Sequence, residues 1–294
     1  IDQLWQRKFR GRLWADWRLA CSIRKANFDL TVDFTGGDRS AVYSALSGAR
    51  QRWAVDKGRG FAGWKHRAIT HPVPLPGQTR HQVHRHLALV EKLGATNPAP
   101  QPALHLTSQE TDWARRQLPS DGRPTVVAHF IANWLFKCWE DAKAAQVVDW
   151  LHTELGAHVW LTSGPAEKEQ ERARAILSLC QTQPEPHIGT LSLRQLAGLI
   201  SVSRLCVGVD SAPMHMAAAL GTPCVTLFGP TLDMVWAPMG QNALVVREPC
   251  HCIESGEKQC AHNAIRDCFL NLQPTTVQNA VESLWKTAPD SHDG

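Results

Sequence analysis

Short apolar strands alternate with helices through the second half of this 294-residue chain, and this alternation constrains the fold more than any other feature. Such alternation predicts a parallel sheet with helices on both faces. Ligands of these sheets bind beyond the carboxyl ends of the strands, so the turns after the four predicted strands should share one cleft. The predicted strands are 125–129, 158–161, 205–209 and 224–228, and the predicted helices are 139–155, 166–180, 191–200 and 213–220.

The first half contains the same kind of unit in a shorter form. A β-rich run is followed by a glycine turn and a helix, which is the βα unit of an open α/β sheet. A stretch rich in proline separates this half from the next. Because such stretches commonly connect domains, we predict domains over 1–107 and 108–294. The elements predicted in the first half are strands over 28–34 and 51–55 and helices over about 39–46, 81–93 and 108–118.

Composition excludes several classes of protein. With 43% hydrophobic and 20% charged residues, the chain is globular rather than disordered or fibrous. No apolar run approaches the roughly 18 residues that a membrane-spanning helix needs. The net charge of +4 is too weak to indicate a nucleic-acid partner. We therefore expect a protein of two domains that does not bind nucleic acid.

The nine cysteines fall into two groups. Five lie singly in predicted helices or strands, which indicates buried thiols in a reducing compartment rather than a disulfide framework. The other four, with His251 and His262 among them, offer enough donors for a tetrahedral zinc ion. Their C-x-C spacing is tighter than the usual C-x₂₋₄-C, so we favour reduced thiols over zinc. The single cysteines are Cys21, Cys138, Cys180, Cys206 and Cys224, and the cluster is Cys250, Cys252, Cys260 and Cys268.

The first 25 residues are basic, with seven Lys or Arg against two Asp. Apolar residues recur at helical spacing, which predicts an amphipathic helix over about 12–26; they are Leu13, Trp14, Trp17, Ala20 and Ile23. We favour a surface helix that packs its tryptophan stripe on a sheet. Peripheral contact with an anionic membrane is the alternative.

The turn after strand 205–209 opens a helix at an expected anion site. Ser211 is a favourable N-cap residue, and Pro213 is tolerated in a first turn. A helix start that faces a cleft binds anions such as a phosphate or diphosphate. Asp210 would repel that anion unless it holds a hydroxyl, a backbone N–H or a cation. It serves equally well as a helix cap, and the sequence leaves both interpretations open.

Two further charges are expected at the strand ends. Lys137 is the only cation in the mainly apolar loop 130–139, where it can neutralise a leaving phosphate. Glu167 has two interpretations. It accepts hydrogen bonds from a ribose or base, or it supplies a favourable charge in the first turn of the next helix.

The segment 191–231 carries a family resemblance. Its runs 207–219 and 227–231 resemble the signature of the ADP-heptose:lipopolysaccharide heptosyltransferases, glycosyltransferase family 9, and 136–141 is similar to the heptosyltransferase III branch. The resemblance implies a GT-B fold, with two Rossmann-like domains facing each other across a cleft. It implies a monomeric cytoplasmic enzyme, peripheral on the inner membrane. That enzyme would move a heptose from ADP-heptose to the inner core of lipopolysaccharide, with inversion and without a metal or other cofactor.

The same resemblance implies roles for individual residues. Lys137, near the donor phosphates, and Asp210, toward the sugar, are the expected catalytic residues. The expected donor-binding residues are Glu167, toward the ribose or adenine, and Ser211, Ala212 and His215, around the diphosphate or heptose. Arg39 in the first domain is expected to contact the acceptor.

The chain also departs from the family pattern. Ala212 stands where the family usually has Gly, and Phe130 and Asn133 stand where the branch has Pro and Arg, so a fork-shaped anion donor is absent. The family opens with a strand and a Gly-Asp turn whose Asp is the expected general base, and nothing upstream of Ile1 supplies it. We therefore expect an N-terminal domain that lacks its first βαβ unit. A non-catalytic or inactive nucleotide-sugar-binding remnant is the alternative function.

Two other interpretations are disfavoured. Asp33 and Asp38 lie at a different strand end, and a displaced base is costly, so we do not expect either to replace the missing Asp. A dinucleotide-dependent oxidoreductase fits the alternating pattern, but no G-x-G-x-x-G follows any of the strands.

Overall fold

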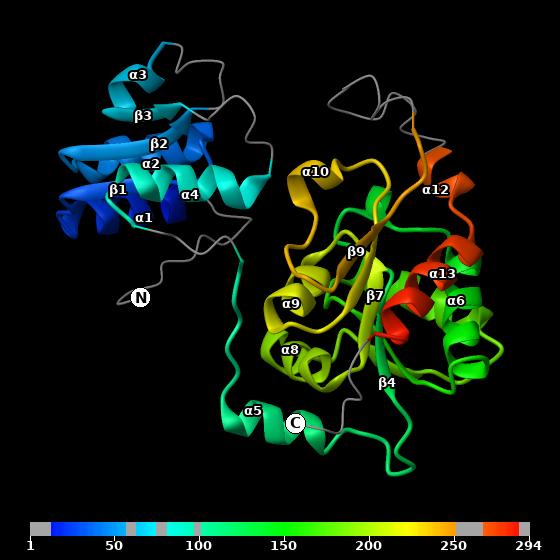
Figure 1. Ribbon diagram of the computed structural model, residues 1–294. Helices are drawn as coiled ribbons and strands as arrows, with labels where there is room; N and C mark the ends of the chain where they lie inside the picture. Colours follow the sequence, from blue (N-terminus) through cyan, green and yellow to red (C-terminus); the bar gives the residue numbers. More distant parts are fainter. Residues whose placement is uncertain (1–12, 57–62, 75–80, 97–100, 251–266, 288–294) are drawn as a thin grey trace. The chain divides into compact units, whose positions relative to one another are not determined.

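The computed structural model describes residues 13–56, 63–74, 81–96, 101–250 and 267–287. Contacts divide the chain into two compact units, Ile1–Pro100 and Gln101–Gly294 (Figure 1). The division lies a few residues before the boundary placed at 107/108 from sequence. The N–H of Leu104 donates to the carbonyl of Ala219 at 3.1 Å, which ties the segment before residue 108 to the second unit.

The first unit is a three-stranded parallel sheet with the order β1-β2-β3. Neighbouring residues of β2 point to opposite faces, so Ala54 packs with Ala41 under α2, while Val55 packs with Leu89 of α4 on the other face. The predicted strands and helices are present, and α3 and β3 are additional. The elements are α1 (Leu13–Lys25), β1 (Leu30–Asp33), α2 (Asp38–Ser47), β2 (Gln51–Asp56), α3 (Lys65–Ala68), β3 (His71–Pro74) and α4 (Gln82–Lys92).

The packing of α1 differs from the sequence expectation. The helix lies against α2, where the hydroxyl of Tyr43 donates to Asp16 at 3.2 Å. Trp14 and Trp17 are 69% and 60% exposed, so the tryptophan stripe does not pack on a sheet. The prediction of the helix is confirmed, and the prediction that its tryptophans pack on a sheet is wrong.

The second unit is a six-stranded parallel sheet with the order β6-β5-β4-β7-β8-β9. The chain builds outward from β4 through β5 to β6, and then crosses back to place β7 on the other side of β4. The strand order therefore reverses between β4 and β7. The elements are α5 (Ser108–Arg115), β4 (Thr125–His129), η1 (Leu135–Lys137), α6 (Asp141–Thr153), β5 (His158–Ser163), α7 (Glu167–Leu179), β6 (Glu185–Ile188), α8 (Leu193–Val202), β7 (Leu205–Val209), α9 (Ala212–Leu220), β8 (Cys224–Leu227), α10 (Asp233–Trp236), β9 (Ala243–Val246), α12 (Asp267–Asn271) and α13 (Pro274–Trp285).

Helices cover both faces of this sheet, as predicted. Helices α6, α7 and α13 contact one face, and α8 and α9 contact the other, with α5 packed on α8 (Figure 1). At the reversal, an ideal Cβ on Gly208 would lie 2.1 Å from the carbonyl oxygen of His129, so β7 approaches β4 this closely only through glycine.

The sequence missed β6 and β9, the two edge strands. The run Glu-Pro-His-Ile of β6 lacks the alternation and β-branched content that indicate a strand. Proline is tolerated there because an edge strand has one side without ladder partners.

Other expectations have mixed outcomes. The described cysteines form no disulfide with one another; Cys138, Cys206 and Cys224 are buried, but Cys21 is exposed rather than buried. Cys252, Cys260 and both cluster histidines lie outside the described residues, so the zinc alternative stays untested. Within the described ranges, no helix combines the length and hydropathy needed to cross a bilayer.

The turn between β1 and α2 depends on the buried Asp33. Its Oδ1 accepts hydrogen bonds from the N–H groups of Thr35 (2.8 Å) and Gly36 (3.1 Å), and its Oδ2 accepts one from the hydroxyl of Ser40 (2.6 Å). Asp38 is exposed and pairs with Lys65. Asp33 is thus engaged in holding the turn and the start of α2.

We expect Asp33→Ala to lower the free energy of unfolding of the first unit by about 2 to 4 kcal/mol, because several donors lose their charged acceptor. Asp33→Asn keeps the Oδ1 acceptor and loses only the bond from Ser40, so its cost should be about half as large. Native-state hydrogen exchange of the β2 amides measures both. Equal losses in the two variants would contradict this account of the turn.

Candidate functional site

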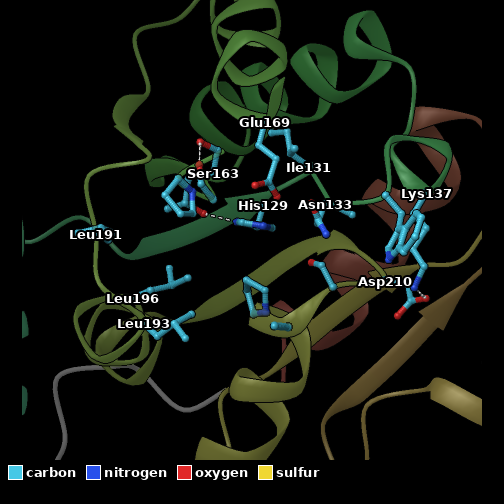
Figure 2. Close-up of a pocket in the computed structure, with 18 of the residues that line it drawn as sticks. His129, Ile131, Asn133, Lys137, Ser163, Glu169, Leu191, Leu193, Leu196 and Asp210 are labelled. Carbon is cyan, nitrogen blue, oxygen red and sulfur yellow. Dashed lines mark hydrogen bonds and ion pairs between the residues drawn. The ribbon is translucent and has the colours of Figure 1, made fainter. Parts of the chain in front are cut away.

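A cavity of about 470 Å³ lies at the carboxyl ends of β4, β5 and β7, beside the strand-order reversal (Figure 2). Its lining comes from 129–137, 162–169, 191–196 and 210–213. Three of the four turns predicted to share a cleft therefore do so. The turn after Phe228 does not line the cavity. The start of α8 does line it. The sequence predicted this helix but not its place at the cavity, because the preceding strand β6 was not predicted.

Lys137 and Asp210 form an ion pair at this cavity (Figure 2). The ammonium of Lys137 donates to Asp210 Oδ2 at 2.7 Å, and the hydroxyl of Thr231 donates to the same oxygen at 2.7 Å. The Asp210 side chain is only 6% exposed, and a carboxylate so buried needs a cation or hydrogen bonds. The sequence left Asp210 either as a helix cap or as a side chain that holds a cation or a hydroxyl. In the structure Asp210 holds a cation and a hydroxyl.

Helix α9 begins at the cavity with its first turn uncapped by a side chain. Ser211 occupies the N-cap position, but its hydroxyl donates to the carbonyl of Val209 at 3.0 Å instead of accepting from the helix. The expected side-chain cap is therefore not made. Ser211, Ala212 and Pro213 line the cavity, so the positive end of the helix dipole faces it.

Glu169, rather than Glu167, lines the cavity from the start of α7. Its buried carboxylate accepts a hydrogen bond from the N–H of Ala166 at 3.3 Å. An ideal Cβ on Gly164 would lie 2.6 Å from Glu169 Oε2, so this glycine leaves room for the carboxylate. Glu167 is exposed and outside the lining. A sequence signal for Glu169 existed, since Glu at the third helical position commonly caps a helix start.

Two other expected site residues lie elsewhere. His215 is half-buried one turn into α9 and does not line the cavity. Arg39 is exposed in the first unit, where it lines a separate hollow of about 590 Å³ between α1 and the start of α2. Cavity residues that the sequence did not single out include the exposed Trp134.

His129 lines the cavity at the end of β4 and is almost fully buried. Its Nδ1 lies 2.8 Å from the hydroxyl oxygen of Thr162. Burial lowers the pKa of His129 to about 4, against a smaller opposing effect from the backbone of Ile131. The imidazole is therefore neutral at pH 7 and adds no charge to the cavity.

This burial predicts a pH-dependent stability. The unfolded chain protonates His129 near pH 6.5 and the folded chain only near 4, so the unfolded state binds more protons between these values. Stability from this group is complete above pH 6.5 and declines as the pH falls to 4, by about 3 kcal/mol in total. Urea unfolding of the wild type and of His129→Gln across this range measures it. The destabilisation caused by the substitution should shrink by that amount at pH 4, and a pH-independent difference would contradict the assignment.

The chain is similar in sequence to known proteins. The family described as glycosyltransferase family 9 (heptosyltransferase) matches residues 16–265. Lipopolysaccharide heptosyltransferase 3 of Escherichia coli is 33% identical over 225 residues, which is 76% of this chain and 65% of that protein. The chain thus matches less than two thirds of the length of this relative.

Solved structures show the same fold. The glycosyl transferase family 9 protein of Veillonella parvula has a TM-score of 0.74 at 20% identity, covering 95% of this chain and 81% of that one. The E. coli heptosyltransferase WaaC, solved with ADP, has a TM-score of 0.67 at 20% identity, covering 92% of this chain and 77% of that one. These likenesses confirm the predicted Rossmann-like GT-B class. The family match, which spans most of both units, establishes that this chain belongs to glycosyltransferase family 9.

Proposed function

We propose that this chain carries the donor-binding and leaving-group machinery of a lipopolysaccharide heptosyltransferase. It would transfer a heptose from ADP-heptose to the inner core with inversion and without a metal. The observation that carries the proposal is the joint placement of Lys137, Asp210 and the start of α9 at one cavity. Family membership and the names of the relatives, a lipopolysaccharide heptosyltransferase and a heptosyltransferase solved with ADP, support the substrate class.

The cavity has the chemistry of a sugar-diphosphate site. Its volume of about 470 Å³ lies within the range of small-molecule pockets. The start of α9 attracts a diphosphate, and the ammonium of Lys137 has three N–H groups, of which one is bonded to Asp210. The remaining N–H groups can donate to the diphosphate while the ion pair persists.

We assign recognition of the nucleoside hydroxyl groups to Glu169 in place of Glu167. The Glu169 carboxylate is buried in the cavity lining, and an ionised carboxylate is a strong acceptor for hydroxyl groups. Among the described residues, the hydrogen bonds to the Asp210 side chain all reach Oδ2. Oδ1 is therefore the oxygen assigned to a hydroxyl of the donor sugar.

The reaction would be a single displacement. The acceptor hydroxyl oxygen attacks the anomeric carbon, the bond from that carbon to the ADP oxygen breaks on the opposite face, and the hydroxyl proton passes to a general base. Lys137 and the first turn of α9 would meet the charge that develops on ADP. Asp33 is no substitute base, since it is committed to the β1–α2 turn.

The alternative of a binding remnant makes a different prediction from an active enzyme. A remnant binds ADP-heptose or ADP and transfers nothing, whereas an enzyme does both. Calorimetric titration with ADP, UDP and GDP, together with a transfer assay on a lipopolysaccharide acceptor, separates the two. Stronger binding of UDP or GDP would contradict the proposed donor.

In an active protein, Lys137→Ala should lower turnover a hundredfold or more, because one donor to developing charge contributes about 2.7 to 4 kcal/mol. Lys137→Arg keeps the charge and should recover part of the loss. Lys286 is an exposed lysine at the C-cap of α13. The substitution Lys286→Ala is the control and should leave turnover unchanged. Near-normal turnover of Lys137→Ala would refute the role of Lys137.

Thr231 is a positioning residue in this proposal, since its hydroxyl holds Asp210. Thr231→Val removes that hydrogen bond at constant shape and should lower kcat about tenfold, with ADP affinity changed by less than about twofold. Thr231→Ser restores the hydroxyl and should restore kcat. An equal loss in Val and Ser variants, or a parallel loss of ADP affinity, would indicate a packing role instead.

A further inference from the structure

The loop 132–138 presents exposed aromatic side chains beside the cavity. Trp134 is 64% exposed and Phe136 is 44% exposed. Trp139, which directly follows this loop, is by contrast 1% exposed and belongs to the core of the second unit. Trp134 belongs to the lining of the cavity. Its indole therefore adds little to the core, and its open surface faces the space in which a ligand would bind.

The backbone that carries Trp134 is held by hydrogen bonds within the loop. The N–H of Ala132 donates to Cys138 Sγ at 3.2 Å, and the thiol donates back to the Ala132 carbonyl at 3.6 Å. The N–H of Lys137 donates to the carbonyl of Trp134 at 2.8 Å. The indole also contacts the ring of Phe136, with centroids 6.0 Å apart. An aromatic ring that is already held in place loses little freedom when a ligand binds to it.

Trp134 lies at the polar end of the cavity. Figure 2 shows Lys137 and Asp210 at one end of the cavity and Leu191 and Leu193 at the other. The hydrogen bond from the Lys137 N–H keeps Trp134 in the same tight turn as Lys137. The indole is therefore close to the groups that would bind the diphosphate and the donor sugar.

A sugar ring has two kinds of surface, and this end of the cavity matches both. Hydroxyl groups surround the edge of a pyranose, and an ionised carboxylate such as Asp210 accepts hydrogen bonds from them. C–H groups cover the faces of the ring. Their hydrogens carry partial positive charge, so they are attracted to the negative face of an aromatic ring such as that of Trp134.

We propose that Trp134 stacks on the pyranose ring of the donor sugar while Asp210 Oδ1 accepts a hydrogen bond from a hydroxyl at its edge. The donor sugar is the occupant because it is bonded directly to the diphosphate, which Lys137 and the start of α9 attract to this end of the cavity. A ring held by one face and one edge has a fixed orientation. Trp134 thereby positions the anomeric carbon for displacement.

This inference rests on the proposed function, because it adds a contact to the same donor. The two are nevertheless tested separately, since ADP contains the nucleotide and the diphosphate but not the donor sugar. If the wild type binds neither ADP nor ADP-heptose, both the proposed function and the role of Trp134 fail. If the wild type binds both and Trp134 has no effect on the sugar, only the role of Trp134 fails.

The test is calorimetric titration of the wild type and of Trp134→Ala with ADP-heptose and with ADP. The substitution should weaken the binding of ADP-heptose about tenfold and change the binding of ADP less than about twofold, because only the sugar loses its aromatic contact. Trp134→Phe keeps an aromatic face and should recover most of the affinity for ADP-heptose.

The matched control is Trp64→Ala, which removes a tryptophan that is 49% exposed at the N-cap of α3 in the first unit. It should bind both ligands like the wild type. Far-ultraviolet circular dichroism should be the same for all the variants, because the substituted side chains are exposed.

Three outcomes would overturn the proposal. Unchanged affinity of Trp134→Ala for ADP-heptose would show that the indole does not contact the donor sugar. Equal losses of affinity for ADP and ADP-heptose would move the contact to the nucleotide or the diphosphate. A raised KM for the lipopolysaccharide acceptor with unchanged affinity for ADP-heptose would make the acceptor the occupant.

Discussion

The close approach of β7 to β4 is the constraint on which the site of the second unit depends. Gly208 has no Cβ, and any larger residue would meet the carbonyl oxygen of His129. This contact lies where the strand order reverses. The chain leaves β4 toward one face of the sheet and leaves β7 toward the other, so the turns after these two strands separate and leave a cavity between them. Lys137 enters that cavity from one turn and Asp210 from the other. Without the reversal, the two charges would not meet.

The Lys137–Asp210 pair makes a buried carboxylate tolerable beside an anion site. Removing Asp210 from water is costly, and the ammonium of Lys137 and the hydroxyl of Thr231 offset that cost. The three groups follow β4, β7 and β8, which are consecutive in the sheet although β5 and β6 come between β4 and β7 in the sequence. The charge of Asp210 thereby offsets part of the positive potential that Lys137 presents to a ligand. The start of α9 is the second source of positive potential for a diphosphate.

Much of the site was predictable because the turns that follow parallel strands all lie at the same edge of the sheet. This argument correctly brought Lys137, Asp210 and the start of α9 to one cavity. It named Glu167, whereas Glu169 lines the cavity. The two residues lie on nearly opposite sides of α7, so only one of them faces the cavity. It missed the start of α8, because β6 has the composition of a loop. It placed the turn that contains Thr231 at the cleft, but it did not predict the hydrogen bond from Thr231 to Asp210, because a hydroxyl contact between two turns leaves no local pattern.

The sequence by itself determined the α/β class, the positions of most strands and helices, and the family. These follow from periodicity, turn residues and short motifs, which are local properties of the chain. The tertiary structure alone decided which face of each element is buried. In α1 the predicted apolar stripe joined Trp14 and Trp17 to Ile23, yet Ile23 is turned toward α2 with Leu19, and the tryptophans remain in solvent. Local spacing establishes that a helix has two faces, but long-range packing selects the one that is covered.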